Sequence, residues 1–271
     1  MNKLDNFVHT IHNALPQDQV VLISTTLLCM IMNLIGRMID NYLMIAVSTP
    51  APCVIFLSVS RLSLQHKEHS DGDKLRVNMV AIGLFLSCIG DVVLCLRISG
   101  YETIIFVMGI IIFGVVQALY IYAWSFASGQ KESVHYKRAV PFLLYFIVFK
   151  VTGTGCQIDP LTVLMDAYMV LILTTAWRCA ARIDLSSQAS FYQLLAFVGV
   201  LLFLACDSMI GYQALNAKYV ECLTIVNMSL YWVGQLLIAL SCNECVTLQD
   251  VVSYVTSTKE RYVKAQGQAD Y

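Results

Sequence analysis

The chain has 271 residues, of which 58% are hydrophobic and only 13% are charged. Soluble domains carry about 25% charged residues, so this composition excludes an ordinary soluble protein and indicates a polytopic membrane protein. The formal net charge of −1 predicts neither a nucleic-acid-binding surface nor an acidic tail. Residues 1–18 lack the cationic start of a secretory signal, so we expect no cleaved leader.

Apolar runs of about 20 residues predict membrane-spanning helices. Eight such runs occur in the sequence, and the fifth, 139–152, is the shortest and ends near Lys150 and a Gly-Thr-Gly turn. We expect an all-α, eight-helix membrane domain over residues 17–241, flanked by a cytoplasmic N-terminal segment (1–16) and a cytoplasmic C-terminal tail (242–271). The eight runs are 17–35, 42–60, 76–97, 103–126, 139–152, 160–178, 191–213 and 223–241.

The distribution of positive charge predicts the orientation of these helices. Cytoplasmic loops collect Lys and Arg. If both chain ends share one side of the membrane, that side holds 13 of the 17 Lys and Arg residues, and the opposite side keeps Arg37, Arg97, Lys150 and Lys218. An even number of spans with both termini in the cytosol accounts for this asymmetry.

Two aspartates lie in matching apolar frames, Gly83-Leu-Phe-Leu-Ser-Cys-Ile-Gly-Asp91 and Gly199-Val-Leu-Leu-Phe-Leu-Ala-Cys-Asp207. Both frames belong to spans that run outward from the cytosol, and each aspartate lies roughly 9 Å of helical rise before the far end. An ionisable group in hydrocarbon is costly and marks a site that faces a cavity or a partner. The frames therefore predict a paired acid centre at one depth.

Further polar side chains occur in the predicted spans at related depths. Thr49 and Asp166 fall near the level of the two aspartates, whereas Gln117, Tyr231 and Gln235 lie deeper toward the cytosol. A polar cavity open to the non-cytoplasmic side would collect all of them. Alternatively, Asp166 is a structural group, and the tyrosine and glutamine of the last span hydrogen-bond between helices.

The third and fourth spans also resemble the seventh and eighth. The series Gly83, Asp91 and Gln117 parallels Gly199, Asp207 and Gln235. Four spans separate the two copies, so the copies would run parallel, as in membrane proteins built from tandem halves. A 4+4 repeat and chance similarity between apolar helices both explain the pattern.

The aspartate frames resemble the signature segments of the YhhN-like lysoplasmalogenases, which read approximately Ser-x-x-Gly-Asp-x-x-Leu and Leu-Phe-x-x-Ser-Asp. Their order and spacing agree with those of four further segments, and the resemblance covers roughly residues 40–240. These segments are the Pro50 and Pro52 pair of the second span, Gly109 to Tyr120 of the fourth, Tyr168 to Arg178 of the sixth, and Tyr231-Trp-Val-Gly-Gln235 of the eighth.

The resemblance implies hydrolysis of the vinyl ether bond of lysoplasmalogens, which yields a fatty aldehyde and glycerophosphocholine or glycerophosphoethanolamine. It also implies an endoplasmic reticulum membrane, since eukaryotic relatives are associated with that compartment. Two positions depart from the family pattern: Thr49 stands where a Lys is common, and Gln117 where a His is common. These changes leave open a catalytically inactive member.

Vinyl ether cleavage requires an acid that protonates the β-carbon, followed by addition of water. Burial and a neighbouring carboxylate are the two general means by which proteins keep a carboxylic acid protonated. We therefore expect one of Asp91 and Asp207 to donate the proton and the other to stabilise the cation and take a proton from water. Candidates for binding the lysophospholipid substrate are Thr49, Gln117, Tyr120, Asp166, Tyr168, Tyr231 and Gln235.

Several alternatives remain at this point. The two aspartates could be helix-packing acids, or the acids of a proton-coupled small-molecule or lipid transporter. The five histidines lie outside the predicted spans, so the sequence predicts no metal site and no cofactor. Ser87 has no histidine nearby to act as a base. A disulfide between Cys156 and Cys222 is geometrically conceivable, because both fall near non-cytoplasmic loops.

Overall fold

The computed structural model describes residues 17–39, 41–49, 52, 71–96, 99–125, 135–154, 158–183, 190–216 and 221–243. Within these ranges the chain is helical and contains no β-strand. The all-α, eight-helix prediction is therefore confirmed. The helices are α2 (Gln17–Met38), α3 (Tyr42–Ser48), α5 (Asp71–Leu94), α6 (Glu102–Ser125), α7 (Val140–Phe149), α8 (Pro160–Arg182), α9 (Ser190–Asn216) and α10 (Glu221–Leu240).

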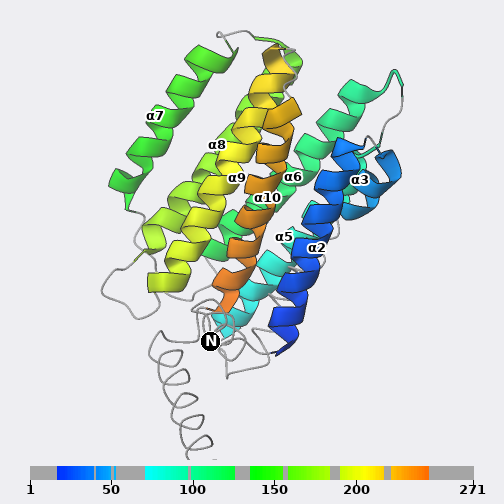
Figure 1. Cartoon of the computed structure of the whole chain (residues 1–271). Coiled ribbons are helices and arrows are strands. Elements are labelled where there is room, and N and C mark those ends of the chain that lie inside the picture. Colours follow the sequence, from blue (N-terminus) through cyan, green and yellow to red (C-terminus); the bar gives the residue numbers. More distant parts are fainter. Residues whose placement is uncertain are drawn as a thin grey trace, which may run out of the picture.

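The helices form a bundle built from antiparallel neighbours (Figure 1). The closest packing is between α5 and α6 and between α9 and α10, while α8 joins the two hairpins by contacting α6 and α9. Helices α5 and α9, which carry the two aspartates, run in the same direction, and α6, α8 and α10 run in the opposite one (Figure 1). The predicted parallel arrangement of the two aspartate spans agrees with this geometry.

Helix α7 lies at the edge of the bundle, beside α8 (Figure 1). None of its residues is buried, and Leu143, Leu144 and Val148 are more than half exposed. A π-helical turn, η3 (Lys150–Thr154), continues α7 and contacts α9. At its other end, α7 is preceded by a 3₁₀ turn, η2 (Tyr136–Ala139), whose Arg138 donates to the carbonyl oxygens of Ala180 and Ala181 near the end of α8.

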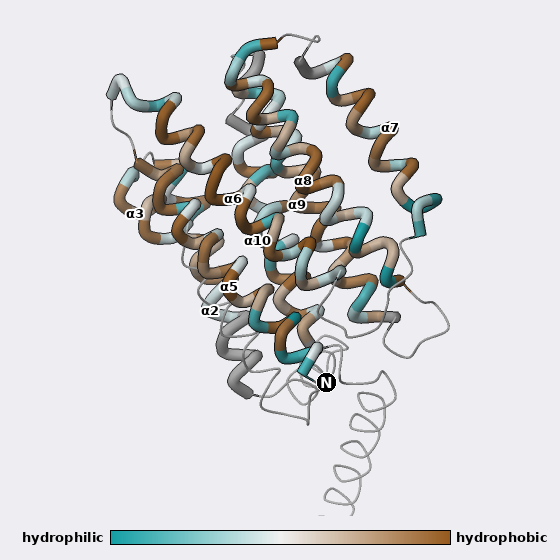
Figure 2. Tube along the Cα trace, turned by 180° about the vertical axis from the view of Figure 1, so that it is seen from behind, coloured by the Kyte–Doolittle hydropathy of each residue, from teal (hydrophilic) through white to brown (hydrophobic). Residues whose placement is uncertain are grey.

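The helices are hydrophobic over most of their length (Figure 2), and many of their large apolar side chains are exposed. In the described part of the chain, four segments are long and apolar enough to cross a membrane: α5, α6, α8 and residues Phe191–Ala214 of α9. Shorter apolar segments are Ser24–Met38 of α2 and Thr224–Leu240 of α10. Such a surface suits lipid rather than water. The protein is a multi-pass integral membrane protein.

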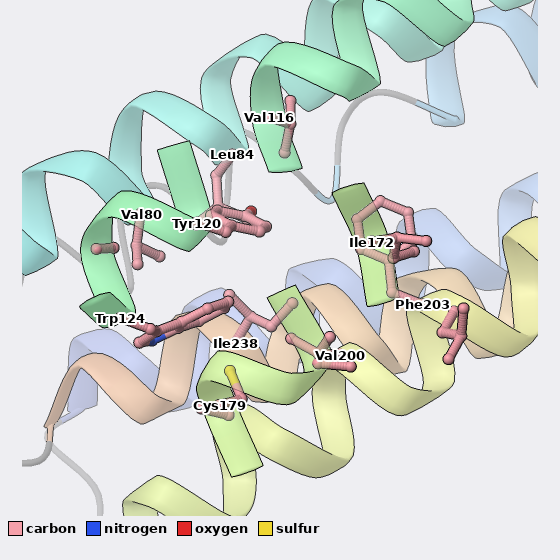
Figure 3. Close-up of a cluster of buried hydrophobic side chains, with 14 of the residues drawn as sticks. Val80, Leu84, Val116, Tyr120, Trp124, Ile172, Cys179, Val200, Phe203 and Ile238 are labelled. Carbon is pink, nitrogen blue, oxygen red and sulfur yellow. The ribbon is translucent and has the colours of Figure 1, made fainter. Parts of the chain in front are cut away.

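The core lies where five helices meet (Figure 3). Leu84 of α5, Trp124 of α6, Ile172 of α8, Phe203 of α9 and Ile238 of α10 are each at most 1% exposed. These large side chains fill the space between the α5–α6 and α9–α10 hairpins. The core therefore fixes the relative position of the two aspartate helices.

Two glycines allow the tight contacts inside the hairpins. A Cβ atom on Gly199 of α9 would lie 2.7 Å from the carbonyl oxygen of Gly234 of α10, closer than side chains tolerate. A Cβ atom on Gly83 of α5 would lie 2.4 Å from the ring of Tyr120 of α6. Small residues at helix interfaces let backbones approach closely in membranes. Each glycine precedes its aspartate by eight residues and so anchors the helix that carries it.

The N-terminus of α8 is fixed by a side-chain cap. Asp159 accepts hydrogen bonds from the backbone N–H groups of Leu161 and Thr162, each at 3.0 Å, and from the hydroxyl of Thr162 at 2.5 Å. These bonds hold the pKa of the Asp159 carboxyl below its ordinary value. Pro160 at the first helical position also favours a helix start here.

Some predictions fall on parts of the chain outside the described ranges. Of the predicted second span, 42–60, the structure describes 42–49 and residue 52. The terminal segment 1–16 and the tail beyond residue 243 lie outside it, as do Cys156 and the side chain of Cys222. The domain boundaries and the disulfide therefore stay predictions.

Candidate functional site

A cavity of about 80 Å³ lies between α5, α6, α8, α9 and α10, and both predicted aspartates line it. Most of the wall is apolar, and the polar side chains are few and come from different helices. This combination is typical of small-molecule sites. The lining residues are Asp91, Leu94, Phe106, Gly109, Ile110, Phe113, Met165, Tyr168, Cys206, Asp207, Ile210, Gly211, Met228 and Tyr231.

Each aspartate accepts a hydrogen bond from a tyrosine on another helix. The hydroxyl of Tyr231 on α10 donates to Oδ2 of Asp91 on α5 at 3.0 Å. The hydroxyl of Tyr168 on α8 donates to Oδ2 of Asp207 on α9, and the thiol of Cys206 donates to its Oδ1 at 3.7 Å. Asp91 is buried and Asp207 is half-buried. Both carboxyl groups are thereby fixed in orientation.

The two tyrosine partners break the symmetry that the sequence repeat suggests. Asp91, on α5, accepts its hydrogen bond from a tyrosine of α10. Asp207, on α9, accepts its hydrogen bond from a tyrosine of α8. Related frames therefore place the two acids at related positions, but in different surroundings. Such a difference is what an acid and a base sharing one site require.

Three aromatic rings pack together beside the cavity, and two of them, those of Phe113 and Tyr231, line it. Phe113, Phe203 and Tyr231 meet edge to face, with ring centroids 5.5 to 6.2 Å apart. Phe203 lies one helical turn before Asp207 and is 1% exposed. The ring cluster of Phe113, Phe203 and Tyr231 therefore lies on the side of the cavity that the charge distribution predicts to be cytosolic.

Beyond the ring cluster lies a second set of polar side chains. The hydroxyl of Tyr120 donates to Oε1 of Gln235 at 3.1 Å, and Nε2 of Gln235 donates to the hydroxyl oxygen of Ser87 at 3.1 Å. All three residues are completely buried, and none lines the cavity. Tyr120 and Gln235, predicted to bind substrate, thus connect α6, α10 and α5 one turn deeper than the acids.

Gln117 lies fully buried in α6, one turn deeper than Phe113. Among the described residues, neither its amide oxygen nor its amide nitrogen has a hydrogen-bond partner. A buried amide without partners is costly. Gln117 is not among the residues that line the cavity, so the structure places it close to the site but not at its surface.

Thr49 lies apart from the cavity, between α2 and α3. Its hydroxyl accepts a hydrogen bond from Asn33 at 2.7 Å and donates to the carbonyl oxygen of Ile45 at 2.7 Å. Its own carbonyl oxygen accepts a bond from the indole N–H of Trp232 at 3.4 Å. These contacts join the first helices to α10. The structure does not bring Thr49 together with Asp91 and Asp207.

Asp166 forms an ion pair with Lys150 beside the cavity. The Nζ atom of Lys150 lies 2.5 Å from Oδ2 of Asp166, and both side chains are 23% exposed. Asp166 does not line the cavity, but its neighbour Met165 does. The sequence indicated Asp166 as a candidate polar group, whereas it placed Lys150 only as a loop cation. The structure joins the two.

Sequence reasoning missed the apolar part of the wall, which includes Phe106, Ile110, Ile210 and Met228. An apolar side chain in an apolar helix has no signal that separates a cavity-facing position from a lipid-facing one. Cys206 could have been found, because it directly precedes Asp207 in the quoted frame. No group of three His, Cys, Asp or Glu side chains in the described part of the chain could hold a metal ion.

The sequence profile of the YhhN family matches residues 44–242, which is most of the chain. The chain belongs to the YhhN family. The match runs from α3 to the end of α10 and so includes every residue of the cavity wall. The family resemblance drawn from the aspartate frames is confirmed.

One curated relative is the human protein named lysoplasmalogenase TMEM86A. It is 27% identical over 166 residues, which are 61% of this YhhN chain and 65% of the human protein. The chain therefore spans just under two thirds of the length of that relative. No solved structure matches the chain.

Proposed function

We propose that this protein hydrolyses the vinyl ether bond of lysoplasmalogens in the endoplasmic reticulum membrane, with Asp91 and Asp207 as the general acid and base. The observation that carries the proposal is that both aspartates line one cavity, each bonded to a tyrosine from a different helix. Membership of the YhhN family and the likeness to a human lysoplasmalogenase support it.

The reaction needs one proton donor and one proton acceptor. One carboxyl group transfers its proton to the β-carbon of the vinyl ether, which leaves an oxocarbenium ion. The other carboxylate stabilises this cation and removes a proton from the attacking water. The resulting hemiacetal collapses to a fatty aldehyde and a free hydroxyl on the glycerophospholipid. The proton that was donated is regained from the water, so the pair returns to its starting state.

The remaining wall suits the rest of this substrate. Phe106, Ile110, Ile210 and Met228 offer an apolar lining for the part of the alkenyl chain next to the vinyl ether. Tyr168 and Tyr231 hold the two carboxyl groups in place, so little reorganisation is needed when charge develops. We assign these two tyrosines a positioning role.

The test uses purified protein in detergent with an alkenyl-lysophospholipid, and measures free aldehyde. Wild-type protein should release aldehyde, whereas Asp91→Asn and Asp207→Asn should lower turnover by a factor of about 100 to 10,000, because general acid–base catalysis contributes this much. Asn has nearly the same shape as Asp, so both variants should retain the wild-type melting temperature. Full turnover in either variant would exclude the mechanism.

The same assay separates the enzyme from a proton-coupled transporter. A transporter shows its activity only across a sealed membrane, whereas an enzyme works in detergent. Wild-type protein that remains folded in detergent yet releases no aldehyde would contradict the proposed function.

A further inference from the structure

The ion pair of Lys150 and Asp166 lies beside the cavity, with Asp166 next in sequence to a residue of its wall. Asp166 follows Met165, which lines the cavity, and Lys150 follows Phe149. A Cβ atom on Gly211, another lining residue, would lie 2.9 Å from Met165 and 3.5 Å from the ring of Phe149. The pair is therefore connected to the cavity wall through a continuous set of contacts between α7, α8 and α9.

Asp166 lies slightly nearer the outer end of α8 than Tyr168, the partner of Asp207, because it precedes Tyr168 by two residues, or about 3 Å of helical rise. Asp166 follows Pro160, the first residue of α8, by six residues, or about 9 Å of helical rise. Lys150 begins the π-helical turn at the same end of the bundle. Both charged side chains therefore lie on the side of the cavity where α8 begins.

We propose that Lys150 and Asp166 form the headgroup site for a zwitterionic lysophospholipid, with Lys150 binding the phosphate and Asp166 the choline or ethanolamine ammonium. This inference rests on the proposed function, since it extends the same cavity to the headgroup of its substrate. The glycerol backbone spans the distance between this site and the vinyl ether at the two acids.

The charges of the pair complement those of such a headgroup. A lysine ammonium has three donors on a flexible stem, and it binds phosphate as a point charge. When the headgroup enters, Lys150 exchanges the Asp166 carboxylate for the lipid phosphate, which is also negative. Asp166 exchanges the Lys150 ammonium for the lipid ammonium, which is also positive. No partly buried charge is left uncompensated, which keeps the cost of opening the ion pair low.

Binding of saturated ether lipids tests this assignment without any turnover. The probes share one alkyl chain and differ in the headgroup: 1-O-alkyl-glycerophosphocholine, 1-O-alkyl-glycerol 3-phosphate and 1-O-alkyl-glycerol. Lys150→Met should weaken binding of both phosphate-bearing lipids about tenfold, which is the smallest effect expected from losing a hydrogen bond to a charged group. The affinity for the alkylglycerol should not change. Asp166→Asn should weaken only the phosphocholine lipid.

Three controls keep the result interpretable. Lys150→Arg should preserve binding, and Lys137→Met, which changes an exposed lysine at the other end of α7, should have no effect. Glycerophosphocholine without a chain should not compete at equal concentration, because the apolar wall supplies most of the affinity. Equal competition would overturn the assignment to a lipid.

Two outcomes would overturn the headgroup site itself. Lys150→Met could leave all three affinities unchanged, or it could reduce all three equally, which would show a structural role for the ion pair. Because the probes contain no vinyl ether, neither outcome depends on catalysis. A failure of this site is therefore distinct from an absence of aldehyde release by the wild-type protein.

Discussion

The two acids of the cavity accept hydrogen bonds from different side chains. Asp207 accepts from both Tyr168 and Cys206, and Asp91 accepts from Tyr231. Hydrogen bonds to charged groups contribute about 1.5 to 3 kcal/mol each, more than those between neutral groups. At the scale of single residues, the tyrosines should therefore affect turnover although they exchange no proton with the substrate.

Replacing either tyrosine by phenylalanine tests this role. Tyr231→Phe and Tyr168→Phe should each lower kcat roughly 10- to 100-fold, because one hydrogen bond to a charged group is lost. The measurement is aldehyde release over a range of substrate concentrations. Tyr122→Phe, which removes the hydroxyl of an exposed tyrosine on α6, is the matched control and should retain the wild-type rate. A change in KM alone would contradict a role in orienting the acids.

The sequence could predict the two acids but not their partners. A charged residue in an apolar run is visible at once, and the matched frames placed Asp91 and Asp207 at one level, where the cavity contains both. The contacts of Tyr168, Thr49 and Lys150 depend on the rotation of each helix about its axis. Helices that are apolar all round carry no pattern that fixes this rotation.

At the scale of the helices, hydropathy predicted where each helix lies in the sequence more accurately than the residues at which it begins and ends. The run 103–126 corresponds to Glu102–Ser125, and 191–213 to Ser190–Asn216. The helix predicted over 160–178 continues to Arg182. The apolar run ends at residue 178, but arginine is a good helix former, so the helix itself does not end at that residue. The predicted fifth span, 139–152, begins as a helix at Val140 and changes to a π-helical turn at Lys150.

The contact between α9 and α10 provides a prediction at this scale. Gly199→Ala should lower the melting temperature in detergent, because its Cβ would lie 2.7 Å from the Gly234 carbonyl oxygen, and such overpacking costs about 1 to 3 kcal/mol. Gly114→Ala on α6 is the matched control. Its Cβ would meet Leu171 at an ordinary 3.7 Å, and alanine favours helix, so the melting temperature should stay the same or rise. Equal melting temperatures for both variants would contradict the tight contact.

The whole molecule has a predicted orientation that follows from charge rather than from packing. Most of the Lys and Arg residues fall on the side that also holds both chain ends, and Lys150 falls on the other. This orientation predicts that the proposed headgroup site faces the lumen. The helix directions in the bundle are compatible with this orientation (Figure 1).

Protease protection in sealed microsomes tests the orientation. Epitope tags at the two chain ends should be digested by added protease, whereas a tag inserted after residue 156, between α7 and α8, should be protected until detergent is added. The reason is that the positive charge keeps the chain ends on the cytosolic face. Protection of either terminal tag would show that the number of spans or their direction is wrong.

The ring cluster of Phe113, Phe203 and Tyr231 packs between the cavity and the buried pair of Tyr120 and Gln235. We therefore expect reactants to enter and leave the cavity on the side away from the ring cluster. A carrier would have to separate these rings in every transport cycle to pass its substrate through the bundle, whereas a hydrolase can keep them packed. In the proposed reaction, the water-soluble glycerophosphocholine or glycerophosphoethanolamine then leaves toward water and the fatty aldehyde leaves into the bilayer.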